Sequence, residues 1–521
     1  MLVSKKWISL LALSVAGSLI LAGCTSSKSN SNSTSQQQGS TAKKGGTLTI
    51  VQSADINTKN LMGQNNPNFS IEKLIYNTLI HYNHKTLQPE PELASSWKLS
   101  SDNRTITFNL RSGVKYHTGA EFTANDVIGT IKYMQLPTTS SQTKSIAMLI
   151  THMVADNPHK VTLTLDHAVS NLFDLFEMMP IINPSNMQQT ENGKTFDGTG
   201  PFKVDSYSPG VGVKLSKFDG YWQKGEPYLD HVDINVVKSS QGMLSSLKSG
   251  QSQLALDLEP LDAVSIKNNP QYKLVQSDAQ DNTLYVASNV KTPLLSNKAV
   301  RQAISYSIDR KRVLSQVMGG IGEASDLPWS PDSPAYDKAL NHRYTYNPSK
   351  AKSLLEKAGA AGQSVNVYYN SGFAPAAGAA QIIVFDLKQA GLKPVAQPQQ
   401  AATFLTNLQT GNFDGLFVQG HGFGQLHPSI LINGSFPFNA SKNASNFDNA
   451  TYKQLAASVA QTTDPSKQKS LLRQLNKFLL DQQFLSDLVV SSHTYTISSK
   501  VKGLQWNMLD DLVLDKTYIQ K

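Results

Sequence analysis

Residues 91–127 read PELASSWKLSSDNRTITFNLRSGVKYHTGAEFTANDV and combine strand patterns with a glycine turn and the start of a helix. Apolar side chains alternate with polar ones from Ile106 to Leu110, which predicts a strand with one buried face. Thr123, followed three residues later by Asp126, is typical of a helix N-terminus, because the two side chains can cap the first turn. The stretch therefore predicts a β-hairpin that leads into a helix.

Similar signals continue along the rest of the chain. A β-branched run predicts a first strand at 47–51, and 202–218 predicts a hairpin that turns at Ser208-Pro209-Gly210. Apolar residues at helical spacing predict helices in three further segments. These segments are 300–317, ended by Gly319-Gly320, 348–358, opened by Asn347-Pro348, and 465–479, opened by Asp464-Pro465. The fold class indicated is mixed α/β with more than one lobe.

The order of these segments resembles the family 5 extracellular solute-binding proteins of ABC importers. The match includes a Leu-Ala-x-x-Trp strand, a Gly-Val-Lys-Tyr-His-x-Gly turn, where the family signature has Phe in place of Tyr, and a Phe-Thr-Ala-x-Asp-Val helix start, all within 91–127. Further matches are Gly198–Phe202, Val300–Ile304 and Tyr346–Pro348. The resemblance implies a two-lobe periplasmic-binding-protein-like fold of type II, in the large peptide-binding cluster, with an extra subdomain inserted in lobe I. His117 falls in the glycine turn and is interpreted as a structural residue rather than a metal ligand.

The same resemblance implies how the chain divides. Lobe I is expected at 45–281 together with 491–521, its inserted subdomain at about 76–189, and lobe II at 289–490. The two segments that connect the lobes are expected at 283–288 and 489–496. A solute would be enclosed between the lobes as they close by a hinge motion.

The N-terminal segment has the three parts of an export signal. Lys5 and Lys6 precede an apolar run from Trp7 to Leu21, which ends in the box Leu21-Ala22-Gly23-Cys24. This box resembles the bacterial lipoprotein signal, which is cut before the cysteine. We therefore expect a signal peptide at 1–23, a lipid on Cys24 and a flexible polar tether at 24–43, which place the protein outside the cytoplasm on a membrane. An uncleaved transmembrane anchor is disfavoured, because the apolar run is shorter than the roughly 20 residues that a bilayer requires.

Composition limits the chemistry further. Cys24 is the single cysteine in 521 residues, so it permits no internal disulfide and no cysteine-based metal site. The net charge of +9 falls to +7 when two lysines leave with the signal, and the remaining lysines are dispersed rather than clustered. This pattern gives no support to nucleic-acid binding. We expect a monomer without a cofactor, whose partners are a solute and the permease and ATPase subunits of an importer.

The segment expected to face the solute follows a strand pattern at 413–418. Peptide-binding members of the family carry an aspartate in the loop after this strand, and it pairs with the α-ammonium group of the peptide. Here that loop has no acidic residue between Asp414 and Asp448. The candidate ligand-binding residues of this segment are Gln419, His421 and Phe423. Two aromatic residues from elsewhere in the expected lobe II, Trp329 and Phe373, are also candidates.

Three classes of solute remain open. A peptide could be held through its backbone, with Glu323 or Asp326 as the missing acid, and an oligosaccharide would suit aromatic faces and amide groups such as Asn433. A nickel or metal chelate could use His421 and His427, although no acid accompanies the two histidines and their spacing is not a standard one. We rank peptide and oligosaccharide together above the chelate.

Two alternatives of another class remain. A surface hydrolase has no motif support, because neither a Gly-x-Ser-x-Gly elbow nor a His-Glu-x-x-His helix occurs in the chain. The sequence is therefore interpreted as that of a binding protein rather than an enzyme. A sensory receptor on the same fold would differ only in its downstream partner.

Overall fold

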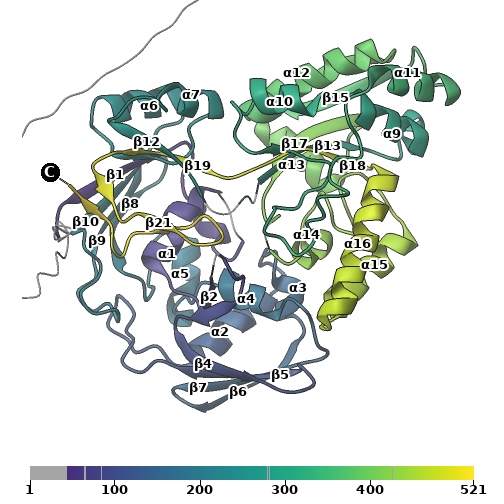
Figure 1. Cartoon of the computed structure of the whole chain (residues 1–521). Helices are drawn as coiled ribbons and strands as arrows, with labels where there is room; N and C mark the ends of the chain where they lie inside the picture. The colour runs from purple at the N-terminus through teal and green to yellow at the C-terminus, as the bar shows by residue number, and fades with distance from the viewer. Residues whose placement is uncertain are drawn as a thin grey trace, which may run out of the picture. The chain divides into compact units, whose positions relative to one another are not determined.

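The computed structural model describes residues 44–63, 66–83, 85–277, 280, 282–424 and 426–520. The predicted signal peptide at 1–23, the predicted lipid site at Cys24 and the rest of the predicted tether to residue 43 lie outside these residues. Helices and strands alternate along the described chain (Figure 1), which confirms the predicted α/β class. None of the described helices combines the length and the apolar character that crossing a membrane demands.

The first large sheet is built around the predicted first strand, β1 (Thr47–Gln52). It has seven strands in the order β12-β19-β11-β1-β10-β9-β8, with β1 parallel to both of its neighbours. The hairpin predicted at 202–218 is confirmed as β8 and β9, and Gly210 in its turn has a φ of +74°. The other bounds are β8 (Phe202–Ser208), β9 (Gly212–Lys217), β10 (His231–Val236), β11 (Leu254–Ala255), β12 (Tyr272–Gln276) and β19 (Thr494–Ser498).

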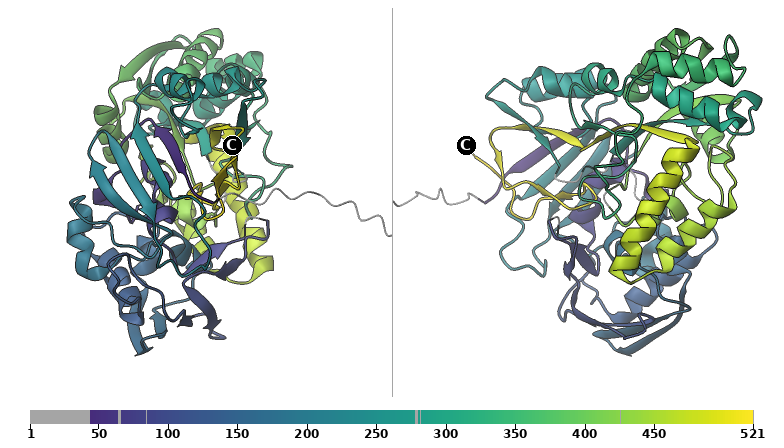
Figure 2. Two further views of the ribbon diagram at one scale, coloured as in Figure 1. Left: turned by 90° about the vertical axis from the view of Figure 1, so that its left-hand side faces the viewer. Right: turned by 45° about the vertical axis from the view of Figure 1, so that its right-hand side comes forward.

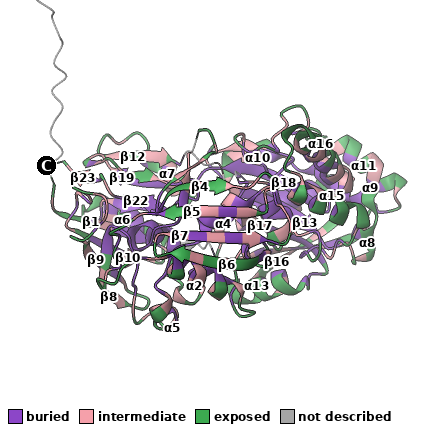
Figure 3. Ribbon diagram, turned by 90° about the horizontal axis from the view of Figure 1, so that it is seen from below, coloured by how far each residue is buried: buried purple, intermediate pink, exposed green. Residues whose placement is uncertain are grey.

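A four-stranded antiparallel sheet contains the hairpin predicted within 91–127. Its order is β4-β5-β7-β6, with β4 at Ala94–Leu99, β5 at Thr105–Leu110, β6 at Ile150–Asn157 and β7 at Lys160–Leu165. Burial alternates along β5 and β7, as the colour bands of Figure 3 show, so one face of this sheet packs on the core. The helix predicted next is α2 (Ala124–Gln135), and Thr123 and Asp126 form the expected capping box. These elements lie within the range predicted for the inserted subdomain. In both views of Figure 2 they lie at the bottom, whereas α12 (Ala374–Gln389) lies at the top.

The second large sheet has six strands in the order β14-β18-β13-β17-β15-β16. Its side chains alternate between two cores. Leu416 and Val418 of β17 face a core covered by α9, α11 and α12. Phe417 points to the opposite side of the sheet, into a core that also contains Tyr285 and Phe438. In Figure 1 α12 lies on one side of this sheet and α14 to α16 on the other. The bounds are β13 (Asn282–Ser288), β14 (Glu323–Ala324), β15 (Ser364–Asn370), β16 (Lys393–Gln399), β17 (Gly415–His421) and β18 (Leu485–Ser491).

The chain passes between the two large sheets at two adjacent places. It leaves β12 at Gln276 and enters β13 at Asn282, and it returns between Ser491 and Thr494. The backbone N–H of Ser277 donates to the carbonyl of His493 at 3.0 Å, so the two passages are linked directly. The expectation that 283–288 is a connecting segment is wrong, because these residues pair along β17 and β18 inside the six-stranded sheet.

The remaining helix predictions agree with the structure except at one break. The segments at 348–358 and 465–479 form α11 and α16. The stripe at 300–317 is split into α9 and α10, because Ile308 is extended and Asp309 caps the second helix. The helices not yet bounded are α1 (Glu72–Ile75), α3 (Lys144–Ala147), α4 (Leu172–Met178), α5 (Met187–Glu191), α6 (Ser240–Lys248), α7 (Pro260–Ser265), α8 (Pro293–Ser296), α9 (Lys298–Ser307), α10 (Arg310–Gln316), α11 (Pro348–Lys357), α13 (Ala401–Thr410), α14 (Ser429–Gly434), α15 (Ala450–Gln461) and α16 (Pro465–Gln482).

Short elements complete the described chain. Two-residue strands after β19 pair as β20 with β23 and β21 with β22, and the three-residue strands β2 and β3 pair with each other. Their bounds are β2 (Ile80–Tyr82), β3 (Pro89–Pro91), β20 (Val501–Lys502), β21 (Gln505–Trp506), β22 (Leu512–Val513) and β23 (Tyr518–Ile519). The 3₁₀ segments are Thr58–Asn60, Asn66–Ser70 and Pro184–Asn186. His117 bonds through Nε2 to the carbonyl of Gly200 at 3.0 Å, in keeping with its structural interpretation.

Candidate functional site

Strand β17 ends at His421, close to where the chain passes between the two large sheets. Across from it on β13, Thr283 pairs with His421 and Tyr285 pairs with Gln419. Directly opposed residues of antiparallel strands lie on the same face of a sheet, so these four side chains share one face. We call this group the β17 face.

Two polar groups on the β17 face are buried without a partner. The Oε1 atom of Gln419 and the hydroxyl of Tyr285 have no hydrogen-bond partner among the described residues. Leaving a buried polar group unpaired costs about 1–3 kcal/mol, so each such group in a native protein needs an explanation. Burial also raises the pKa of Tyr285, which keeps the phenol neutral and able to donate. Gln419 is only partly buried and is suited to a hydrogen bond with a solute, whereas the ring of Tyr285 is fully buried against Phe417 and Phe438.

His421 is held in one tautomer by its own loop. Its Nδ1 atom lies 2.8 Å from the carbonyl of Gly422, which can only accept, so Nδ1 carries the proton. Burial lowers the pKa of His421, and the neutral ring therefore keeps Nε2 as an acceptor. The rings of Phe423 and Phe438 lie edge-on to the imidazole, each at 5.9 Å. The ring is thus fixed in orientation with one acceptor atom left to recognise a donor.

Phe423 adopts a backbone conformation that residues with a Cβ rarely take. Its φ is +75°, and its side chain is only 7% exposed. The left-handed region costs a non-glycine residue roughly 1–2 kcal/mol, and such strain concentrates at functional sites. Packing of the ring beside His421 holds the loop in this state.

An acid that the sequence reasoning missed also lies on the β17 face. Asp487 of β18 is paired in register with Tyr285, and the hydroxyl of Thr283 donates to its Oδ1 atom at 2.8 Å. Burial raises the pKa of Asp487 to about 8. The signal was available in the sequence, since an aspartate interrupts the apolar run at 484–490. The structure therefore supplies a carboxyl group close to the loop that lacks one.

Phe423 lies in the loop after β17, and two further candidate residues come from elsewhere in the chain. Trp329 is 1% exposed, and its indole N–H donates to Asn476 at 2.6 Å. The ring therefore packs in the core of this structure, and its contact with a solute stays a prediction. Phe373 precedes α12 and packs over Gly420, where an added Cβ would lie 3.2 Å from its ring. Gly420 faces opposite to Gln419 and His421 along the strand, so Phe373 supports β17 from behind.

The proposed substitute acids and Asn433 differ in how they are used. Asp326 forms an ion pair with Arg310 at 3.0 Å and accepts from the backbone N–H of Tyr344 at 2.6 Å, so it is already occupied. Glu323 of β14 keeps a buried Oε1 atom that no described residue contacts by a hydrogen bond. Asn433 donates from α14 to the carbonyl of Ala456 at 3.4 Å. Glu323 is the freer of the two acids.

The two histidines considered for a metal have different surroundings. His427 is hydrogen-bonded through Nε2 to Gln468 at 2.7 Å, and burial lowers its pKa to about 4. It lines a cavity of about 610 Å³ together with Trp97, Asp174 and Pro334, and His421 is not part of that lining. Within the described part of the chain, no group of three or more His, Cys, Asp and Glu residues is placed to hold a metal ion.

Comparisons with known proteins agree with this architecture. The family model described as bacterial extracellular solute-binding proteins, family 5 middle, matches residues 88–442. Heme-binding protein A of Haemophilus influenzae is 28% identical over 66% of this chain and 67% of its own length. Di/tripeptide-binding protein 1 of Pseudomonas aeruginosa is 25% identical over 78% of this chain and 82% of its own length.

A solved structure shows the same fold over nearly the whole chain. The periplasmic binding protein DppA of Helicobacter pylori, in complex with the peptide STSA, superposes with a TM-score of 0.79 at 21% identity. The match covers 92% of this chain and 99% of DppA. The likeness confirms the predicted periplasmic-binding-protein fold of the peptide-binding type.

Proposed function

The chain belongs to the family 5 bacterial extracellular solute-binding proteins, and we propose that it captures a peptide or an oligosaccharide on the β17 face and delivers it to an ABC permease. The observation that carries the proposal is the unpartnered Oε1 atom of Gln419 on the same face of β17 as the oriented ring of His421. Extended neutral amides and sugar hydroxyls both offer the donors and acceptors that these groups need.

The character of the β17 face favours a neutral or weakly cationic part of the solute. Its ionisable groups are His421, held neutral, and Asp487, whose pKa of about 8 keeps it largely protonated at neutral pH. A fully ionised ligand group would have to be desolvated there without an ion-pair partner, at a cost of several kcal/mol. A peptide backbone or a glycan avoids that cost. Relatives that bind di- and tripeptides support the peptide half of the proposal.

Capture is proposed to occur by hinge motion without a catalytic step. The predicted lobes, at 45–281 with 491–521 and at 289–490, would rotate about the two passages that Ser277 and His493 link. Hinges of this kind need only a few residues that absorb changes in φ and ψ, while the flanking sheets remain rigid. Gln419, His421 and Phe423 are the residues proposed to contact the solute.

The N-terminal sequence supports a proposal for location. With its signal removed, the protein would carry diacylglycerol on Cys24 and be held at the membrane by the polar segment to residue 43. Labelled fatty acid should enter the wild type and not a Cys24→Ala variant. Equal labelling of both would contradict the proposal.

A thermal-shift and native mass spectrometry screen tests the solute class. The panel holds di- to pentapeptides, neutral oligosaccharides and nickel–histidine chelates, and a true ligand at a hundredfold excess over Kd stabilises the fold by about 2.7 kcal/mol. Stabilisation by a peptide or a glycan that is lost in His421→Ala supports the proposal. Stabilisation by the chelate alone would overturn it, as would a ligand that binds His421→Ala and wild type equally.

A further inference from the structure

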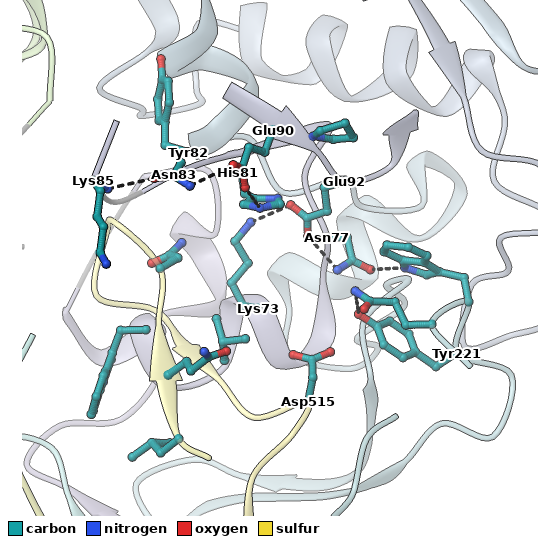
Figure 4. A pocket seen from close by; sticks show the side chains of 18 of the residues that line it. Lys73, Asn77, His81, Tyr82, Asn83, Lys85, Glu90, Glu92, Tyr221 and Asp515 are labelled. Carbon is teal, nitrogen blue, oxygen red and sulfur yellow. Dashed lines mark hydrogen bonds and ion pairs between the residues drawn. The ribbon is translucent and has the colours of Figure 1, made fainter. Parts of the chain in front are cut away.

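A second cavity lies away from the β17 face. It has a volume of about 670 Å³ and is lined by α1, the β2–β3 hairpin, the end of β12, and residues 221–223 and 504–515 (Figure 4). No residue of the six-stranded sheet lines it. Cavities of 300–1,000 Å³ suit small organic ligands. The cavity therefore shares no lining residue with the β17 face.

Most charges that line this cavity are already neutralised by neighbours. The ammonium group of Lys73 lies 3.1 Å from Glu92, which also accepts from Asn77 at 2.8 Å. Glu90 pairs with His81 at 3.2 Å. These contacts lie along one side of the cavity in Figure 4 and use up the acids of that side.

Asp515, on the C-terminal segment, forms no ion pair with a described residue, although the cationic Lys85 also lines the cavity. Its Oδ1 atom is buried and has no hydrogen-bond partner among the described residues, and Figure 4 shows its carboxylate apart from the paired groups. Burial raises the pKa of Asp515 to about 6; a hydrogen bond with Tyr221 works against that rise, whereas the nearby charges of Glu226 and Glu92 add to it. At neutral pH the carboxylate is thus mostly ionised and forms no ion pair with a described residue, so a bound cation would stabilise its charge.

Aromatic side chains line the same cavity. The rings of Tyr221 and Trp222 lie 5.6 Å apart, and Trp506 stacks on Tyr495 at 4.5 Å. The guanidinium of Arg111 lies 4.7 Å from the centre of the Trp222 ring, so one face of this ring is already covered by a cation. Aromatic faces attract cations and bury the apolar body of a ligand at the same time.

We propose that this cavity is a second binding site, which takes a small organic cation with an aromatic or apolar body and uses Asp515 as the counter-charge. The ammonium or guanidinium group lies toward Asp515, and its body packs against Tyr221 and Trp222. The site is independent of solute capture on the β17 face.

Binding of phenethylamine and of its neutral analogue 2-phenylethanol, followed by calorimetry and by tryptophan fluorescence at pH 7.5, tests the proposal on the full chain. The amine should bind wild type at least tenfold more tightly than the alcohol, and Asp515→Asn should remove that difference. Asp205→Asn, which removes an exposed acid, is the matched control and should bind as wild type does.

Two outcomes would overturn the proposal. One is equal binding of the amine and the alcohol by wild type, a result that needs no variant to fold. The other is a loss of amine binding in His421→Ala, because it would place the amine on the β17 face instead. Amine binding that survives in His421→Ala and fails in Asp515→Asn supports the second site, whatever the solute screen shows.

Discussion

The hydroxyl and the backbone N–H of Ser170 both donate to the carbonyl oxygen of Ala460, at 2.9 and 2.8 Å. Ser170 precedes α4, near the four-stranded sheet, whereas Ala460 lies in α15 beside the six-stranded sheet. The bond joins residues that are 290 positions apart in the sequence, and neither residue belongs to the passages between the large sheets. We propose that it latches the two predicted lobes in a closed arrangement.

Replacing Ser170 with alanine should weaken this latch without unfolding the protein. The hydroxyl also donates to Val459 at 3.0 Å, so the variant loses both side-chain bonds and keeps the backbone bond. A typical hydrogen bond contributes about 0.5–1.5 kcal/mol, so solute affinity should fall roughly 2- to 12-fold. Small-angle scattering should show a larger radius of gyration than for wild type. Ser245→Ala removes an exposed hydroxyl within α6 and should change neither quantity.

Replacing His421 separates its acceptor atom from its ring. His421→Phe keeps an aromatic ring between Phe423 and Phe438 and removes Nε2, whereas His421→Gln keeps a polar side chain without the ring. Loss of the acceptor should weaken solute binding at least tenfold, or roughly 1.4 kcal/mol, in His421→Phe. Calorimetry with the solute found by screening measures this. Wild-type affinity in His421→Phe would show that the ring acts only by packing.

Phe423 should show an unusual order of stability among its variants. Both Phe423→Ala and Phe423→Gly lose the buried ring, but only glycine relieves the strain of a φ of +75°. The glycine variant should therefore be more stable than the alanine variant by roughly 1–2 kcal/mol in urea unfolding. In ordinary chain positions glycine is the less stable of the two. Finding that ordinary order here would mean that the loop relaxes and is not strained.

Local signals were sufficient to predict much of the fold. Thr123 and Asp126 form the capping box that their spacing predicts, and the 202–218 hairpin turns where Pro209 and Gly210 require. The break between α9 and α10 was not predicted, because the apolar periodicity continues across Ile308 although the helix ends there. Periodicity reports which side chains are buried, and tertiary packing decides where a helix ends.

The candidate site was harder to predict, because it depends on which strands become neighbours. Gln419 and His421 follow each other on one strand, so their shared face could be inferred from alternation alone. Tyr285 of β13 and Asp487 of β18 join them only because these strands pair in the sheet. Tyr285 and Asp487 are some 200 positions apart in the sequence. Trp329 was expected at the site because large aromatic rings suit ligands, but such rings also fill cores.

Asp487 should make stability fall as pH rises. Its pKa is about 8 in the folded protein against 3.8 ordinarily, so the folded state holds the proton more tightly than the unfolded chain does. The stabilisation is complete below the unfolded value and is lost as pH rises toward 8. In Asp487→Asn the side chain cannot ionise, so this part of the decline should disappear between pH 5 and pH 8.

The comparison of variants isolates Asp487 from other buried acids. Glu177 and Asp174 also have raised pKa values, of about 8 and about 7. Their contributions to the free energy of unfolding also fall as pH rises, and they do so equally in every variant. Urea unfolding across this pH range should therefore give a shallower slope for Asp487→Asn than for wild type, and an unchanged slope for Asp205→Asn. Parallel slopes for wild type and Asp487→Asn would show that Asp487 is ionised in the folded state, and the β17 face would then carry a negative charge suited to a peptide ammonium group.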